Sequence, residues 1–183
     1  MFMRGMIFPG GREPVLHGDG IYLRYPQMSD FAAWAALRGE SHEFLAPWEP
    51  TWAADELSRS AFRRRIRRYQ REIRSDMSYP FFVFRKADDL LMGGCTLSNV
   101  RRGVTQSAAI GYWIGERYAR HGHMYAALTT VLPFVFQVLA LHRLEAAGRR
   151  RRGGARSVAV EVDRKSTRLN SSHQSVSRMP SSA

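Results

Sequence analysis

Residues 111–124 are the part of the chain whose residue types and spacing best suit a chemical task. The segment reads Gly-Tyr-Trp-Ile-Gly-Glu-Arg-Tyr-Ala-Arg-His-Gly-His-Met and runs into an apolar stretch that ends at Leu139. This pattern predicts a strand, a basic turn containing Gly122, and the start of a helix. Since free N–H groups at a helix N-terminus attract phosphate, and more so beside cationic side chains, we expect a site for a pyrophosphate-bearing cofactor. An ordinary turn before a core helix would show a similar pattern.

The net charge of +12 is unevenly distributed over the 183 residues. Residues 148–183 hold nine of the 28 basic residues and only two acidic ones, Glu161 and Asp163. The rest of the chain is therefore only mildly basic, which favours a soluble protein that tolerates acidic partners over a dedicated nucleic-acid binder. The length suits one domain with a real core.

Cys95 is the only cysteine, so we expect no intrachain disulfide and a reducing, cytoplasmic location. Its place in an apolar strand is more typical of a small core residue than of a nucleophile. The apolar N-terminus is too short for a signal peptide, and no stretch approaches 18 apolar residues, so we expect no membrane span.

Hydrophobic periodicity places the segment within a series of strands and helices. The order strand, helix, helix, three antiparallel strands, helix, strand predicts an α+β, or mixed α/β, fold with one sheet. Asp88 and Asp89 suit the turn of a hairpin, while Gly93 and Gly94 indicate a bulge or a close approach of another backbone. Pro133 is expected to kink the last helix. The expected strands cover 20–25, 79–86, 90–100 and 106–114, and another starts at His142; the expected helices run from Ser29 to Gly39, from Asp55 to Ser75 and from Gly122 to Leu139.

Two further segments leave alternatives open. The arginines of the helix at 55–75 form either a solvated face or a docking surface for RNA or an acidic partner. The loop at 45–52, Leu-Ala-Pro-Trp-Glu-Pro-Thr-Trp, combines two prolines with two tryptophans, and we expect it to pack on the domain rather than line a substrate mouth. The arginines concerned are at positions 63, 64, 65, 67, 68, 71 and 74.

Together these residues resemble the GNAT superfamily of acetyl-CoA-dependent N-acetyltransferases, and within it the branch that acetylates the N-terminal alanine of ribosomal proteins. The resemblance covers residues 16–147. It implies a GNAT-type acyl-CoA N-acyltransferase fold with a central, mostly antiparallel sheet flanked by helices, acetyl-CoA as co-substrate, and no metal. It also implies a protein N-terminus as partner and no specific nucleic acid. The matching pieces are Leu45-Ala-Pro-Trp48, Gly93-Gly-Cys-Thr-Leu-Ser-Asn99, Ile110-Gly-Tyr-Trp-Ile-Gly-Glu-Arg-Tyr118 with its turn, and Leu132-Pro-Phe with Leu141-His-Arg-Leu-Glu-Ala-Ala147.

The resemblance assigns the cofactor to the strand and turn already singled out. The pantetheine arm is expected to bond the backbone of Tyr112, Trp113 and Ile114. The pyrophosphate is expected on the turn that follows. This turn keeps the glycine of the family pattern, but the residues at the first and last positions of the pattern are not those usual in the family. The side chains of Arg120 and His121 can supply the positive charge that is missing at the first position, which is Ala119. The turn residues are Arg117, Ala119 at the first place, Arg120, His121, Gly122, His123 and Met124 at the last place.

Acetyl transfer to an amine needs a neutral amine, a donor for the developing oxyanion and an acid for the leaving thiolate. An α-amine has a pKa near 8, so a modest base or a water relay suffices. Glu116 is the candidate base, and Ser98 and Asn99 are candidates for orienting a peptide. Acetylation of a small amine and a non-catalytic ribosome- or RNA-docking role for the arginine helix remain open.

The segment at 148–183 departs from the family. An Arg/Gly-rich run stands where the family continues its sheet, and the last residues resemble a translated sequencing-adapter remnant. We expect this tail to be disordered or artefactual, because its composition suits neither a buried helix nor a closing strand. The alternative is a tail that binds nucleic acid through phosphates. Without the C-terminal third of the family domain, the sheet would expose an edge and apolar surface.

We therefore expect the 183-residue chain to show weak or no acetyl transfer. A chimera with a family-like C-terminal third after Ala147 should be active, because it closes the exposed edge. Turnover of acetyl-CoA by both proteins under the same conditions is the measurement. Equal rates would contradict the expectation.

Overall fold

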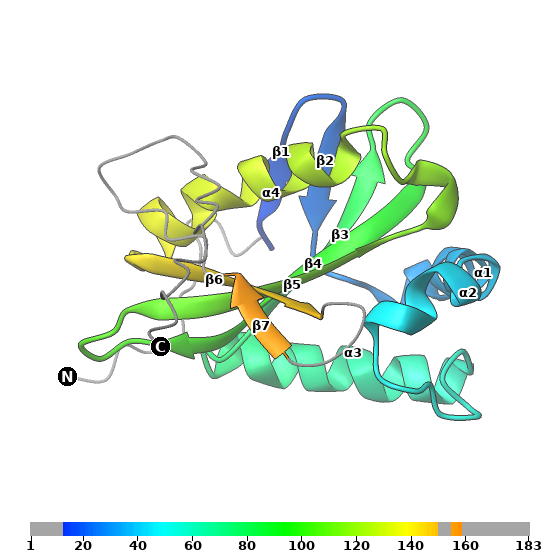
Figure 1. The fold of residues 1–183 in the computed structure, drawn as a ribbon, viewed down its shortest axis with the longest axis horizontal. Coiled ribbons are helices and arrows are strands. Elements are labelled where there is room, and N and C mark those ends of the chain that lie inside the picture. Colours follow the sequence, from blue (N-terminus) through cyan, green and yellow to red (C-terminus); the bar gives the residue numbers. More distant parts are fainter. Residues whose placement is uncertain (1–12, 150–154, 159–183) are drawn as a thin grey trace, which may run out of the picture.

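The apolar runs of the chain form one sheet whose strands lie side by side in sequence order (Figure 1). The computed structural model describes residues 13–149 and 155–158. Neighbouring strands are antiparallel except β5 and β6, which are parallel because α4 connects them. This confirms the expected mixed α/β architecture. The strands are β1 (Val15–His17), β2 (Ile21–Arg24), β3 (Tyr79–Arg85), β4 (Leu91–Arg101), β5 (Ser107–Ile114), β6 (Arg143–Arg149) and β7 (Ala155–Val158).

The helices follow the expected positions, with three local differences. Ser29 lies in a short 3₁₀ turn, and α1 begins after Asp30. The arginine helix begins at residue 59, where the Ser58 hydroxyl accepts a hydrogen bond from the Ala61 N–H at 3.1 Å. The last helix changes to a π-helical turn directly after Pro133, which lacks an N–H. The helices are η1 (Met28–Asp30), α1 (Phe31–Glu40), α2 (His42–Leu45), η2 (Ala46–Trp48), α3 (Arg59–Arg74), η3 (Glu116–Tyr118), α4 (His123–Pro133) and the π-helical η4 (Phe134–Val138).

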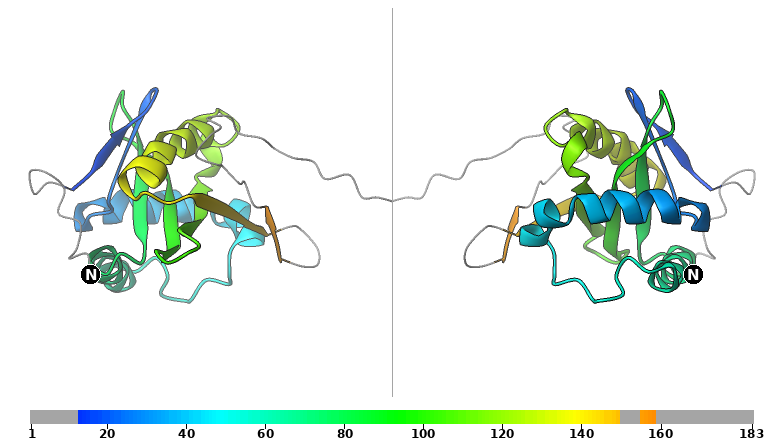
Figure 2. Two further views of the ribbon diagram at one scale, coloured as in Figure 1. Left: turned by 90° about the vertical axis from the view of Figure 1, so that its left-hand side faces the viewer. Right: turned by 90° about the vertical axis from the view of Figure 1, so that its right-hand side faces the viewer.

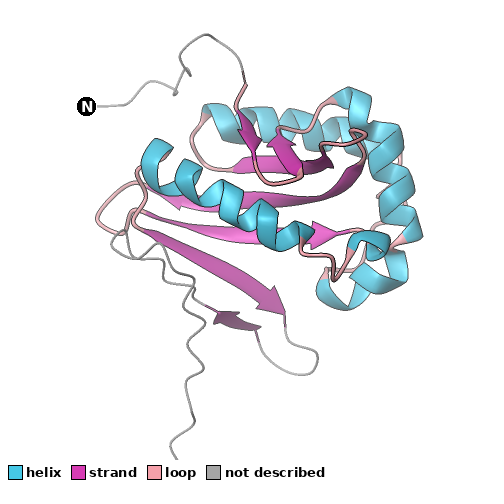
Figure 3. Cartoon of the chain, turned by 90° about the horizontal axis from the view of Figure 1, so that it is seen from above, coloured by secondary structure: helices cyan, strands magenta, loops and turns pink. Residues whose placement is uncertain are grey.

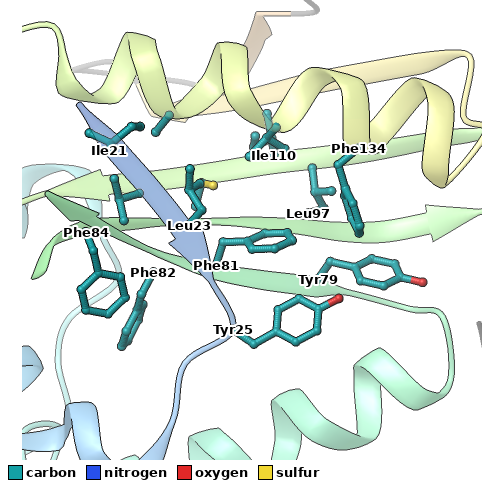
Figure 4. Close-up of a cluster of buried hydrophobic side chains, with 14 of the residues drawn as sticks. Ile21, Leu23, Tyr25, Tyr79, Phe81, Phe82, Phe84, Leu97, Ile110 and Phe134 are labelled. Carbon is teal, nitrogen blue, oxygen red and sulfur yellow. The ribbon is translucent and has the colours of Figure 1, made fainter. Parts of the chain in front are cut away.

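Apolar side chains on both faces of β3 explain why helices cover the sheet on two sides. Phe81 meets Phe134 of η4 edge to face, with ring centroids 5.3 Å apart. Phe82 points the other way, toward Phe62 of α3 at 6.5 Å (Figure 4). Consequently α4 lies on one side of the sheet and α3 on the opposite side (Figure 2). None of the described helices is long and apolar enough to cross a membrane.

The sheet continues past residue 147, where we expected the domain to end. β6 extends to Arg149, and β7 pairs antiparallel with it from Ala146↔Val158 to Arg149↔Ala155. The expectation that the composition of the tail precludes a further strand is therefore wrong for residues 155–158. Backbone pairing in a sheet makes few demands on side chains, so a short strand forms despite the polar composition. The remaining tail residues lie outside those described.

Gly93 and Gly94 allow β4 to lie unusually close to its neighbours, as the sequence predicts. A Cβ on Gly93 would contact the Trp113 carbonyl oxygen and lie 3.0 Å from the Ile114 Cα. A Cβ on Gly94 would lie 2.9 Å from the Trp113 Nε1 and 3.0 Å from the Phe81 oxygen. These neighbours are largely backbone, which cannot yield cheaply.

The substitution Gly93→Ala should lower the free energy of unfolding by about 1–3 kcal/mol, because the added methyl forces β4 and β5 apart. Urea denaturation measures the effect. Gly103→Ala is the matched control, since a Cβ there meets nothing within 4 Å. Equal stability of the two variants would show that β4 and β5 tolerate a wider spacing.

Candidate active site

β5 and β6 pair only along the first half of β5. Their parallel register runs from Ser107↔Arg143 to Ile110↔Ala146. Beyond this point β6 pairs with β7, and the last two strands lead away from the rest of the sheet (Figures 2 and 3). Among the described residues, no strand pairs with residues 111–114 on the side that faces β6.

Two of the three expected pantetheine-binding residues present main-chain groups to this open side. The Gly115 N–H donates to the Met92 oxygen at 2.9 Å, so the main chain of Gly115 faces β4. Because main-chain direction alternates along a strand, that of Trp113 also faces β4. The N–H and C=O groups of Tyr112 and Ile114 therefore point toward the opening. They can bond an extended amide chain as a further strand would.

The turn between η3 and α4 leaves the N-terminus of α4 open. Gly122 is the N-cap in a left-handed conformation, with φ of 79°, and no side chain caps the helix. The first helical bond runs from the Ala126 N–H to the Gly122 oxygen at 2.9 Å. The N–H groups of His123, Met124 and Tyr125 therefore lack an acceptor within the helix. Such a helix start favours an anion.

Cationic and aromatic side chains surround this helix start. Arg120 is exposed and, like Gly122, has a positive φ. The rings of His121 and His123 are nearly parallel, with centroids 6.1 Å apart. Arg117 lies over the ring of Tyr118, with its guanidinium carbon 4.9 Å from the centroid, and pairs with Glu40 at 3.4 Å. Unlike Arg117, the side chains of Arg120 and His121 therefore have no carboxylate partner among the described residues.

These features fit a nucleotide-linked thioester. A Cβ on Gly122 would meet nothing within 4 Å, so this N-cap residue borders open space. Tyr112 and Ile114 would hold the amide-containing arm, and the turn with Arg120 would hold the pyrophosphate. When bound, acetyl-CoA supplies an acyl group activated as a thioester. Within residues 13–149 and 155–158, no group of three His, Cys, Asp or Glu side chains comes close enough to hold a metal ion.

A groove of about 450 Å³ approaches β5 from the α3 side of the sheet. Its floor contains Gly111, and a Cβ there would meet nothing within 4 Å. Its walls are formed by α1, by the loop after η2 and by Arg65, Arg68 and Tyr69 of α3. The lining residues include Arg38, Glu49, Trp52, Arg65, Arg68, Tyr69, Thr96, Gly111, Tyr112 and Trp113.

An arginine clamp fixes the loop wall of the groove. The guanidinium of Arg38 donates to both carboxylate oxygens of Glu49, at 2.8 and 2.6 Å. It lies 4.5 Å from the ring centroid of Trp52 and 5.0 Å from that of Trp113. The Trp52 indole N–H donates to the same carboxylate at 2.9 Å. Because the Arg38 side chain is only 8% exposed, this cluster is a buried, geometrically defined contact between the loop and β5.

The sequence pattern of the acetyltransferase (GNAT) domain family matches residues 21–160. The chain belongs to this family. The match reaches beyond residue 147, where the resemblance in the sequence ends. Fold and enzyme class follow: the protein is an acetyl-CoA-dependent acyltransferase.

Relatives of this acetyltransferase include proteins of the ribosomal-protein acetylating branch. The probable N-acetyltransferase YjcK of Bacillus subtilis is 33% identical over 132 residues, which are 72% of this chain and 73% of YjcK. The [Ribosomal protein uS5]-alanine N-acetyltransferase of Escherichia coli is 28% identical over 70% of this chain, which spans 66% of that protein. The structure of Mycobacterium smegmatis RimJ in complex with CoA-disulfide has a TM-score of 0.67 and 30% identity, covering 75% of this chain and 67% of RimJ.

The acetyltransferase brings the expected cofactor residues together but separates the three catalytic candidates from the groove. Glu116 is exposed in η3, where its main-chain N–H donates to the Ser41 hydroxyl at 3.0 Å. Ser98 is paired opposite Ala109, and Asn99 is exposed at the bulge of β4 with φ of 53°. None of the three lines the groove, whereas Thr96 does.

Cys95 is excluded as a nucleophile by its surroundings. The thiol is buried in β4, and this burial raises its pKa to about 12. A thiol with such a pKa remains protonated near neutral pH and reacts slowly. The structure thus supports the expected role as a small core residue.

Sequence analysis missed the residues that wall the groove. Residues 49–52 line it, so our expectation that the tryptophan loop only packs on the domain is wrong for its second half. Leu45 is buried and does pack in the core. The available signal was the Trp-Glu-Pro-Thr-Trp run, because prolines hold a loop rigid and a carboxylate between tryptophans needs a partner. Nothing in the sequence identified Arg38 as that partner.

The substitution Gly122→Ala should weaken CoA binding about tenfold or more, because the methyl enters the open space at the start of α4 and φ of 79° disfavours an L side chain. Isothermal titration calorimetry with CoA measures this effect. Gly20→Ala is the matched control: Gly20 also has a positive φ, of 63°, and open space, but lies in the β1–β2 turn. Both variants should lose similar stability. A similar loss of CoA affinity in both would show that strain, and not the site, is responsible.

Proposed function

We propose that this acetyltransferase transfers the acetyl group of acetyl-CoA to the α-amine of a protein N-terminus, with a ribosomal protein as the acceptor. The observation that carries the proposal is the meeting of two openings at β5. The gap beside Tyr112 and Ile114 suits the thioester arm, while the groove reaches Gly111 and Trp113 from the α3 side of the sheet. An acyl group and an amine entering by these two routes would meet at the same strand.

Positioning and hydrogen-bond donation account for most of the proposed catalysis. Of the two main-chain N–H groups at the opening, those of Tyr112 and Ile114, one would bond the amide arm and the other would donate where negative charge develops on the thioester oxygen. The groove orients the acceptor so that its amine approaches this point. Because an α-amine has a pKa of about 7.7–8.0, a substantial fraction is already neutral at physiological pH. Glu116, which is exposed, would then serve as a base only through a water relay.

A protein acceptor suits the groove better than a small amine does. The groove is open, and its walls alternate aromatic surface with ion pairs, such as Arg38 with Glu49 and Arg65 with Glu56. A main chain with N–H and C=O groups can bond polar walls of both signs. The Escherichia coli relative is named for the alanine of ribosomal protein uS5, and this supports the same class of acceptor for the present chain.

Two peptides of the same sequence distinguish the acceptor classes. One has a free N-terminal alanine and no lysine; the other has a blocked N-terminus and one lysine. The transfer, which we expect to be slow in this chain, should be confined to the first peptide, with kcat/KM rising about tenfold per pH unit below pH 7.7 and levelling above pH 8, since the neutral amine is the nucleophile. Mass spectrometry locates the acetyl group. Faster transfer to the lysine peptide or to a diamine would overturn the proposed acceptor.

The substitution Gly111→Val connects this activity to the groove. The added side chain projects into open space on the groove floor, so it should raise KM for the peptide severalfold. The affinity for CoA, measured by calorimetry, should stay unchanged. An unchanged KM would place the acceptor elsewhere.

A further inference from the structure

Five arginines form one exposed stripe along α3. Successive members are three or four residues apart, so they lie on the same side of the helix. Their apolar neighbours Phe62 and Ile66 face the core instead. We refer to this set as the arginine stripe; it consists of Arg59, Arg63, Arg67, Arg71 and Arg74.

The other arginines of α3 are neutralised by carboxylates. Arg64 pairs with Asp55 at 2.6 Å, Arg65 pairs with Glu56, and Arg68 pairs with Glu72 at 3.5 Å. Of these three, Arg65 and Arg68 line the groove wall. The carboxylates Asp55, Glu56 and Glu72 are therefore paired with arginines outside the stripe.

The stripe itself has no carboxylate partner within the described part of the chain. Arg59 lies over the ring of Phe31 at 5.8 Å, and Arg74 donates to the Gln70 oxygen at 3.1 Å. Arg63, Arg67 and Arg71 have neither an ion pair nor a side-chain hydrogen bond there. Like charges four residues apart on a helix repel each other, so this arrangement costs free energy in the isolated protein. A bound polyanion would remove that cost.

The chemistry of the stripe favours a phosphate backbone over an acidic protein surface. Successive arginines are about 6 Å apart along the helix, which gives a regular line of charge. None of the exposed large hydrophobic residues among those described belongs to α3. Protein interfaces depend on buried aromatic and aliphatic anchors, which the stripe lacks. The stripe offers guanidinium groups for phosphates and no aromatic surface for bases, and phosphate contacts carry no sequence information, so binding would not depend on sequence.

We propose that the arginine stripe of α3 binds the phosphate backbone of RNA without sequence readout. The choice of RNA rests on the proposed acceptor, since a ribosomal protein is presented on an RNA-rich particle. The opposite flank of the same helix lines the groove, so RNA on the stripe would hold such a particle beside the acceptor site. Binding itself requires neither acetyl-CoA nor acyl transfer.

Fluorescence anisotropy with a labelled 20-nucleotide oligouridylate tests the proposal on the full chain. The variant Arg63→Gln/Arg67→Gln keeps helix propensity and removes two charges. The control Arg85→Gln/Lys86→Gln removes two charges at the β3–β4 turn, on the side of the molecule away from α3 (Figure 1). The parent chain, the stripe variant and the control variant all contain the Arg-rich segment after residue 148. A difference in RNA affinity between them is therefore due to the substituted residues.

We expect the stripe variant to bind about 25-fold more weakly at 0.1 M salt, with a salt exponent smaller by about 1.4, as the loss of two phosphate contacts requires. The control should bind like the parent protein. Equal binding by parent and stripe variant overturns the proposal, as does equally tight binding of a glutamate 20-mer to the parent. The assay omits acetyl-CoA, so failure of peptide acetylation would leave its outcome unchanged.

Discussion

Pairing between β5 and β6 ends after four residue pairs, and the geometry of the candidate site depends on that ending. Had the strands continued together, the main-chain groups of Tyr112 and Ile114 would bond β6 and would not face an opening. The short stretch of pairing is sufficient to bury Ala108 and Ile110 beneath α4. The protein thus leaves backbone donors and acceptors without a strand partner beside a well-packed core, where a bound amide chain can bond them.

Rigid contacts on the other side of β5 keep this open segment in place. Gly93 and Gly94 let β4 lie tightly against Trp113, and the Arg38 guanidinium lies between Trp113 and Trp52. The ion pair of Arg38 with Glu49 is largely buried, so removing either partner would leave a charge without compensation. The clamp therefore couples the loop wall of the groove to the strand that borders the opening.

Local patterns in the sequence were sufficient for most elements, including the strand and the uncapped helix start of the candidate cofactor site. The strand and glycine turn at 111–124 follow from periodicity, and an open helix start follows from Gly122. The groove did not follow, because Arg38, Glu49 and Thr96 come from three separate elements whose contacts are set by tertiary packing. Ser98 and Asn99 were chosen as neighbours in sequence of the right strand, but strand register puts Thr96 in the groove. The pairing of β7 likewise depended on a backbone partner and not on composition.

The burial of Cys95 has a practical consequence for the study of this enzyme. The thiol lies in the centre of the sheet and keeps its proton, so the folded protein should contribute little signal when released CoA is titrated with a chromogenic disulfide. The same thiol becomes reactive once β4 separates from its neighbours. Its slow labelling would therefore report how often the whole sheet opens, at a single position and without any introduced probe.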